Sequence, residues 1–251
     1  MPEIDEITPT IPPVPEPPPR PAPRPTWPTW VEILLCSGYP TQILIGQLLI
    51  LSGIRPITAN GSLSGTFVFA LSIGDAVLLV SLIILLLMRR GEKPLEVVFG
   101  RRPARSEVAV GILSFPFVIT LVAAMTLAIR GAAPSLHNVP ANPLEGLLGT
   151  GANIWLFLMV VIVAGGVREE VQRGFLLHRF RGDLGQPWLG LLITSLAFGM
   201  GHTLQGLDAA IITGTLGALW GALYLIRGGA LASMVSHSIF NTAQLLIAFL
   251  R

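Results

Sequence analysis

A series of apolar stretches, each about 20 residues long, most constrains how this chain can fold. A helix of that length crosses the hydrocarbon core of a bilayer, because each residue adds about 1.5 Å. Only 12% of the residues are charged, which is about half the share in soluble domains. We therefore expect an all-α, polytopic integral membrane helix bundle with about seven transmembrane helices. The candidate spans are residues 31–54, 66–88, 108–129, 154–177, 188–204, 209–226 and 230–250.

A different composition marks the beginning of the chain. The first thirty residues contain twelve prolines, and such a segment cannot bury a core of its own. We expect residues 1–30 to be a disordered, proline-rich cytoplasmic tail. The alternative to a purely solvated tail is a docking segment for a proline-recognising partner.

The orientation and the class of partner follow from charge. Basic residues gather between positions 89 and 105, and short loops rich in Arg and Lys stay in the cytoplasm. Counting spans from this loop also places the N-terminus in the cytoplasm. All basic residues except Lys93 are Arg, which is typical of a GC-rich bacterial genome and so favours a bacterial plasma membrane. The net charge of +2 gives no reason to expect nucleic acid, and membrane lipid is the expected surrounding.

Polar side chains are placed at helical spacing in three of the late stretches. Charged residues are costly inside a bilayer and persist where they face a protein interior and find a partner. Peptide hydrolysis needs a base for water, donors for the oxyanion and an acid for the leaving amine. A glutamate, two histidines and an asparagine supply these groups. The candidate catalytic residues are Glu169, Glu170, His202, His237 and Asn241, with Arg173 and Phe198 as structural support.

The same side chains could hold a divalent metal ion. Glu169, His202 and His237 would be the ligands, with one coordination position left open for water or substrate. Because ligands from several helices are normal in the core of a bundle, the spacing leaves both zinc and no cofactor open. The single cysteine excludes a Cys-based zinc site and an internal disulfide.

Three strings in order, Glu169-Glu170…Arg173-Gly174-Phe175, Phe198-x-x-x-His202 and His237-x-x-x-Asn241, resemble the CAAX-protease and bacteriocin-processing (CPBP) family, which includes the type II CAAX prenyl proteases. The resemblance implies a CPBP-like catalytic helix core over residues 151–251, preceded by N-terminal membrane helices and loops over 31–150. It implies an intramembrane endopeptidase, often labelled a metalloprotease, acting on a membrane-associated protein or peptide. The alternative is a non-proteolytic membrane scaffold or self-immunity protein on the same fold.

By the resemblance, a glutamate activates water with help from His202, while His237 and Asn241 stabilise the oxyanion. The first motif departs from the family pattern, because two residues instead of three separate the glutamate pair from Arg173. Glu169 occupies a family glutamate position whether the motif is aligned on the pair or on Arg173. We therefore expect Glu169 to be the base ahead of Glu170, and Arg173 to pair with Glu169 at i and i+4.

Two expectations concern geometry. Asp75 is an isolated acid within the 66–88 stretch, and it is either protonated or paired with a distant span. Counting along the spans places Glu169 near the inner end of one helix and His202 near the outer end of the next. A shared site would then require a deeper start, a tilt or a re-entrant course for the helix that carries His202.

Overall fold

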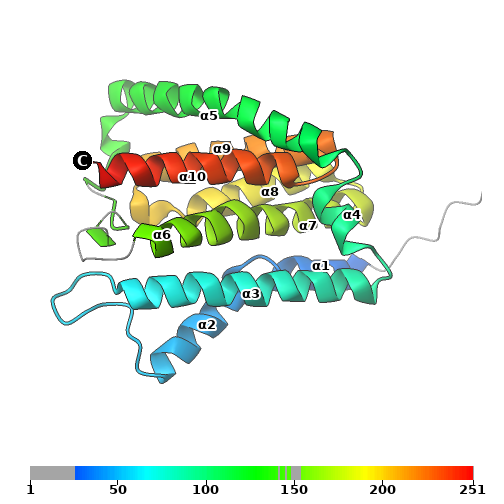
Figure 1. The fold of residues 1–251 in the computed structure, drawn as a ribbon, viewed down its shortest axis with the longest axis horizontal. Coiled ribbons are helices and arrows are strands. Elements are labelled where there is room, and N and C mark those ends of the chain that lie inside the picture. The colour runs from blue at the N-terminus through cyan, green and yellow to red at the C-terminus, as the bar shows by residue number, and fades with distance from the viewer. Residues whose placement is uncertain (1–25, 141, 145, 148–153, 251) are drawn as a thin grey trace, which may run out of the picture.

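The computed structural model describes residues 26–140, 142–144, 146–147 and 154–250, and its helices pack side by side into a bundle (Figure 1). In these ranges β-structure is limited to one isolated bridge between Ile57 and Leu63. The expected all-α helical class is therefore confirmed. The prediction for the proline-rich tail falls almost wholly on residues 1–25, which lie outside the described part.

The N-terminal region forms a bent helix followed by a long straight one. Helix α1 (Thr26–Leu35) and α2 (Tyr39–Leu51) meet at an angle of 41°. The bend lies just before Pro40, where Gly38 adopts a φ of 90° that favours glycine. Helix α3 (Gly65–Arg89) begins at Ser64, whose hydroxyl accepts a hydrogen bond from the amide of Phe67.

Two helices connect this region to the C-terminal half. The short α4 (Pro94–Phe99) leads into α5 (Ala104–Ala132), which ends in a 3₁₀ turn, η1 (Pro134–Leu136). The turn between the last two helices holds α4 in place, because the amide of Ala230 donates to the carbonyl of Val98 at 2.7 Å.

The C-terminal half contains the candidate catalytic residues. Helix α6 (Ile154–Val160), the π-helix η3 (Val161–Arg168) and α7 (Glu169–Gly182) follow one another without a break. Then come α8 (Pro187–Met200), the 3₁₀ turn η4 (Thr203–Gln205), α9 (Leu207–Arg227) and α10 (Leu231–Phe249). Helix α8 packs on α9, and α10 packs on both α5 and η3 (Figure 1).

The expected count of seven spans is not confirmed by the part of the chain that the structure describes. Among the described residues, three helical stretches are long and apolar enough to cross a membrane: Gly65–Arg89, Pro94–Ala132 and Leu207–Arg227. Helices α1 and α2 together make a fourth if the bent pair is one span. Helix α8 has 14 residues, or roughly 21 Å, which is short of the ~30 Å hydrocarbon core. Helix α7, which carries the glutamate pair, is 14 residues long and contains several charged residues. It is therefore not among the stretches that are long and apolar enough to cross a membrane.

Two glycines of α9 allow it to lie close to its neighbours. A Cβ at Gly217 would lie 2.9 Å from the ring of Phe198, and one at Gly221 would lie 3.3 Å from the side chain of Arg173. Cβ contacts this short require the neighbour to move. The glycines therefore make room for the aromatic ring and the guanidinium that border the candidate site.

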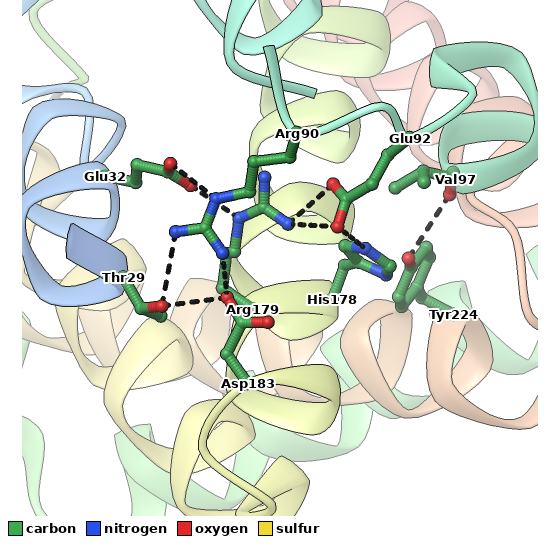
Figure 2. Close-up of polar contacts among 9 residues, drawn as sticks. All are labelled: Thr29, Glu32, Arg90, Glu92, Val97, His178, Arg179, Asp183 and Tyr224. Atoms are coloured by element: carbon green, nitrogen blue, oxygen red, sulfur yellow. Dashed lines mark hydrogen bonds and ion pairs between the residues drawn. The ribbon is translucent and has the colours of Figure 1, made fainter. Parts of the chain in front are cut away.

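A buried set of ion pairs ties α1, the end of α3 and α7 together (Figure 2). Arg179 is fully buried and donates to Glu32 at 2.7 Å and to Glu92 at 2.7 and 2.9 Å. Arg90 donates to Glu32 at 2.8 Å and to Asp183 at 2.5 Å. We call these five residues the Arg179 network. It fixes the depth of α7 against the N-terminal helices.

The Arg179 network predicts a loss of stability in acid. Burial by itself would raise the pKa of Glu92, but hydrogen bonds from His178 and Arg179 lower this pKa to about 2. A lowered carboxyl pKa stabilises the fold at pH values above the unfolded pKa, about 4.5, and the stabilisation is lost as the pH falls toward 2. We expect the melting temperature of the wild type to exceed that of Glu92→Gln at neutral pH, and the difference to shrink between pH 4.5 and 2. A difference that stays constant across this range in detergent would contradict the assignment.

Candidate active site

A buried carboxylate on α7 faces a histidine on α10. The side chain of Glu170 is 1% exposed, and its Oε1 accepts a hydrogen bond from His237 Nδ1 at 2.9 Å. The same oxygen accepts from the guanidinium of Arg173. Arg173 was expected to pair with Glu169, and this expectation is wrong: the ion pair forms at i and i+3 with Glu170. Glu170 therefore occupies the interior of the bundle.

The π-helix that precedes the glutamate pair packs closely on α10. A Cβ at Gly166 would lie 2.9 Å from the Cβ of Ser238, so only glycine permits this approach. Asn241 Nδ2 donates to the carbonyl of Val161 at 3.3 Å. A π-segment holds one more residue per turn than an α-helix, and this changes the direction of the side chains that follow it. The direction of the α7 side chains relative to α6 therefore differs from the one that continuous α-helical spacing would give.

His237 is held from several sides. Its ring stacks on Trp220 with centroids 3.8 Å apart and an interplanar angle of 19°, and its side chain is 5% exposed. Because a carboxylate only accepts, the hydrogen bond to Glu170 places a proton on Nδ1. The other nitrogen, Nε2, lies 3.8 Å from Oε2 of Glu169. His237 therefore lies between two carboxylates, each facing a different ring nitrogen.

The two glutamates differ in accessibility. The side chain of Glu169 is 21% exposed and is within reach of water or substrate. Glu170 is enclosed, and its second oxygen, Oε2, has no hydrogen-bond partner among the described residues. An ionised carboxylate in this environment needs compensation, which Arg173 supplies.

His202 reaches the same region through Phe198. His202 Nδ1 hydrogen-bonds the carbonyl of Phe198 at 2.8 Å, so this nitrogen carries the proton and leaves Nε2 as an acceptor. The Phe198 ring lies 4.8 Å from the His202 ring and 6.1 Å from the His237 ring, centroid to centroid. The guanidinium of Arg173 lies 4.5 Å above the same ring.

The geometric conflict expected between Glu169 and His202 is absent, because helix α7 continues to Gly182. Helices α7 and α8 are each 14 residues long, are joined by a short connection and pack on each other. In such a helical hairpin the start of one helix lies level with the end of the other. His202 follows the end of α8, so it lies level with the start of α7, where Glu169 stands. Among the described residues, no hydrogen bond or ion pair joins the two side chains directly.

The donor set does not fit a metal ion. In the part of the chain that the structure describes, no three His, Cys, Asp or Glu side chains gather closely enough to hold one. Glu169 and His237 are neighbours, but His202 is separated from them by the Phe198 ring. No chemical step is therefore derived through a metal.

In one buried ion pair beside the site, the identity of the partner was not anticipated. Asp75 of α3 pairs with Arg168, the last residue of η3, at 2.5 Å, and both side chains are buried. Arg168 also donates to Gln172 at 2.8 Å, and Gln172 donates to the carbonyl of Cys36 at 3.0 Å. The sequence contained the signal, because Asp75 and Arg168 have opposite charges and each interrupts an otherwise apolar stretch. Of the two alternatives for Asp75, pairing with a distant span is therefore the one observed.

Comparison with known proteins supports the motif analysis. Residues 150–243 match the family described as Rce1-like, type II CAAX prenyl endopeptidase Rce1-like. The matched segment includes all five candidate catalytic residues. No curated protein and no solved structure matches the chain.

Proposed function

Because residues 150–243 carry an Rce1-like, type II CAAX prenyl endopeptidase domain, we propose that this chain is an intramembrane endopeptidase that hydrolyses a membrane-associated protein or peptide. The observation that carries the proposal is the position of His237 between the carboxylates of Glu169 and Glu170, inside a bundle of apolar helices. We place the protein in a bacterial plasma membrane with residues 89–105 on the cytoplasmic side, as the basic loop favours.

Glu169 is the proposed general base. Its carboxylate and the Nε2 of His237 are both acceptors and lie 3.8 Å apart, so a water molecule beside them can donate to both. Glu169 takes the proton as the water oxygen attacks the peptide carbonyl carbon, and gives it to the amine nitrogen as the C–N bond breaks. The partial exposure of Glu169 supports this role, because the base must reach a substrate that enters from outside.

Glu170 and Arg173 position His237. Glu170 fixes the Nδ1–H form of the ring and turns Nε2 toward Glu169, while Arg173 compensates the negative charge of Glu170. A carboxylate in this position also stabilises the protonated ring if His237 carries a proton during the reaction. The stack on Trp220 restricts rotation of the ring.

Asn241 is the proposed donor to the oxyanion, and His202 is a second group that acts on the water. Asn241 is one helical turn beyond His237, and its amide donates to Val161 through a long hydrogen bond of 3.3 Å. The amide has a second N–H, which can donate to the oxyanion. His202 assists water activation with its free Nε2.

Replacing Asn241 with Ala should lower kcat roughly 10²–10³-fold, the effect of removing one oxyanion donor. KM should change little, because the amide acts mainly on the transition state. Gln244→Ala is the matched control, since Gln244 is an exposed amide on the same helix. Equal turnover in the Asn241 variant and the control would remove Asn241 from the site.

The proposed function is tested with the full-length protein in proteoliposomes. The probes are a farnesylated CAAX peptide and the membrane proteins of the expression host, and mass spectrometry identifies new chain termini. We expect cleavage by the wild type and by His137→Ala, and none by the double variant His202→Ala/His237→Ala. Cleavage that persists in the double variant would refute the proposed site. Equal termini with and without the wild-type protein would favour the scaffold or self-immunity alternative.

A further inference from the structure

A basic pocket lies where α4, the end of α7 and the end of α9 meet. The cavity has a volume of about 640 Å³ and is separate from the candidate active site, because His178 and Arg181 lie two or more helical turns beyond Glu170. Five cations and two carboxylates line it, so its walls carry an excess of positive charge. The charged lining residues are Lys93, Arg101, Arg102, Arg181, Arg227, Glu92 and Glu96.

The excess charge belongs to two arginines in particular. Lys93 and Arg101 share the carboxylate of Glu96, at 2.9 and 2.7 Å. Arg102 Nε donates to the carbonyl of Arg227 at 3.0 Å, and Arg181 donates to the carbonyl of Leu225 at 2.5 Å. Neither Arg102 nor Arg181 pairs with a carboxylate within the described ranges. These carbonyl bonds orient the two guanidinium groups without neutralising them.

The pocket is built into the fold and does not depend on a flexible loop. A Cβ at Gly100 would lie 2.6 Å from the carbonyl oxygen of Gly228, and the φ of Gly100 is 73°, so only glycine fits this contact. Tyr224 donates its hydroxyl to the carbonyl of Val97 at 3.2 Å (Figure 2). These contacts fix α4 against α9, and the hydrogen bonds to the carbonyls of Arg227 and Leu225 orient the two guanidinium groups before any ligand binds.

The segments that line the pocket also expose apolar side chains. Leu95 is 72% exposed, Ile226 69% and Phe99 40%, and each lies within two residues of a pocket-lining residue. Exposed apolar residues next to basic ones are typical of the boundary between headgroups and acyl chains. A soluble anion would use the arginines alone, whereas a lipid would contact both surfaces.

We propose that this pocket binds the phosphate group of an anionic phospholipid. The phosphate oxygens accept from Arg102 and Arg181, and the acyl chains lie against Leu95, Phe99 and Ile226. The geometry of guanidinium groups suits phosphate oxygens well. The site is independent of the proposed peptidase activity, because it uses none of the candidate catalytic residues.

The test compares lipid retention by variants of the full-length protein. Wild-type protein is equilibrated in nanodiscs of phosphatidylglycerol and phosphatidylcholine, and native mass spectrometry counts the lipid that stays bound after extraction. We expect selective retention of phosphatidylglycerol. The double variant Arg102→Gln/Arg181→Gln should bind it roughly 30-fold more weakly, at about fivefold for each cation.

Two control variants separate charge at this pocket from charge in general and from folding. Arg55→Gln/Arg130→Gln removes the same charge from exposed positions outside the pocket, and this variant should retain the lipid. Arg102→Lys/Arg181→Lys keeps the charge and should retain most of the binding. Unchanged retention in the Gln variant, or equal retention of phosphatidylcholine, would overturn the proposal. Displacement of the lipid by millimolar inorganic phosphate would overturn the assignment to a lipid.

Discussion

Glu169→Gln should lower kcat roughly 10²–10⁴-fold, because the amide cannot accept the proton of the attacking water. The amide keeps the shape of the side chain, so substrate affinity and the melting temperature should be nearly unchanged. Glu169 is partly exposed, and within the described residues its ion pair is a long one of 3.8 Å to His237, which supports the small effect on stability. Single-turnover cleavage of an identified substrate measures the chemical step separately from product release.

Glu170→Gln is the matched control for this prediction. It removes the charge that compensates Arg173 and leaves only a neutral amide oxygen to accept from His237, so it should reduce both turnover and the melting temperature. The two variants therefore differ in stability as well as in activity. Normal turnover in Glu169→Gln together with complete loss in Glu170→Gln would assign the base to Glu170.

Arg179→Met should destabilise the protein by about 3–5 kcal/mol, because it leaves the carboxylates of Glu32 and Glu92 without their buried partner. Methionine retains much of the volume, so the effect reports the lost charge more than a cavity. Equilibrium unfolding in mixed detergent micelles measures the difference from the wild type. Arg101→Met provides the comparison, since Arg101 is 85% exposed and pairs with Glu96.

The exposed pair of Arg101 should contribute only about 0–1 kcal/mol. Similar losses in the two variants would show that the burial of Arg179 does not determine its contribution. If Arg179→Met greatly lowers the free energy of unfolding but each folded molecule keeps full activity, the Arg179 network has a structural role only.

The long apolar helices could be predicted from the sequence because their length alone identifies them. Helices α3, α5 and α9 lie within the expected stretches or extend a few residues beyond them. The end of the helix that carries the glutamates was harder to predict, because the hydropathy falls at Arg168 while the helix continues to Gly182. Polar residues that pair with other helices do not end a helix, and the sequence does not display those partners.

Motif spacing identified the candidate site residues, but it did not predict which of their side chains face the interior of the bundle. The expectation that Arg173 pairs with Glu169 used the i,i+4 spacing, but Glu170 lies at the i,i+3 spacing on the same α-helix, and both spacings bring side chains together. The hydrogen bond from His237 on α10 to Glu170 shows which of the two carboxylates faces the interior. Which carboxylate is enclosed therefore depends on backbone geometry that residue spacing does not encode. The Asp75–Arg168 pair joins helices far apart in the sequence, and only the packing of α3 on η3 brings these residues together.

That pair has a consequence for how the bundle is made. Arg168 by itself would resist entry into the bilayer, since an isolated charge at its centre costs several kcal/mol. Asp75 is synthesised 93 residues before Arg168. We therefore expect its carboxylate to be in the membrane already when the helix with Arg168 leaves the ribosome. The two side chains would then form an ion pair with no net charge, and this pair would position the later helix against α3. The order of synthesis thus becomes part of the folding pathway.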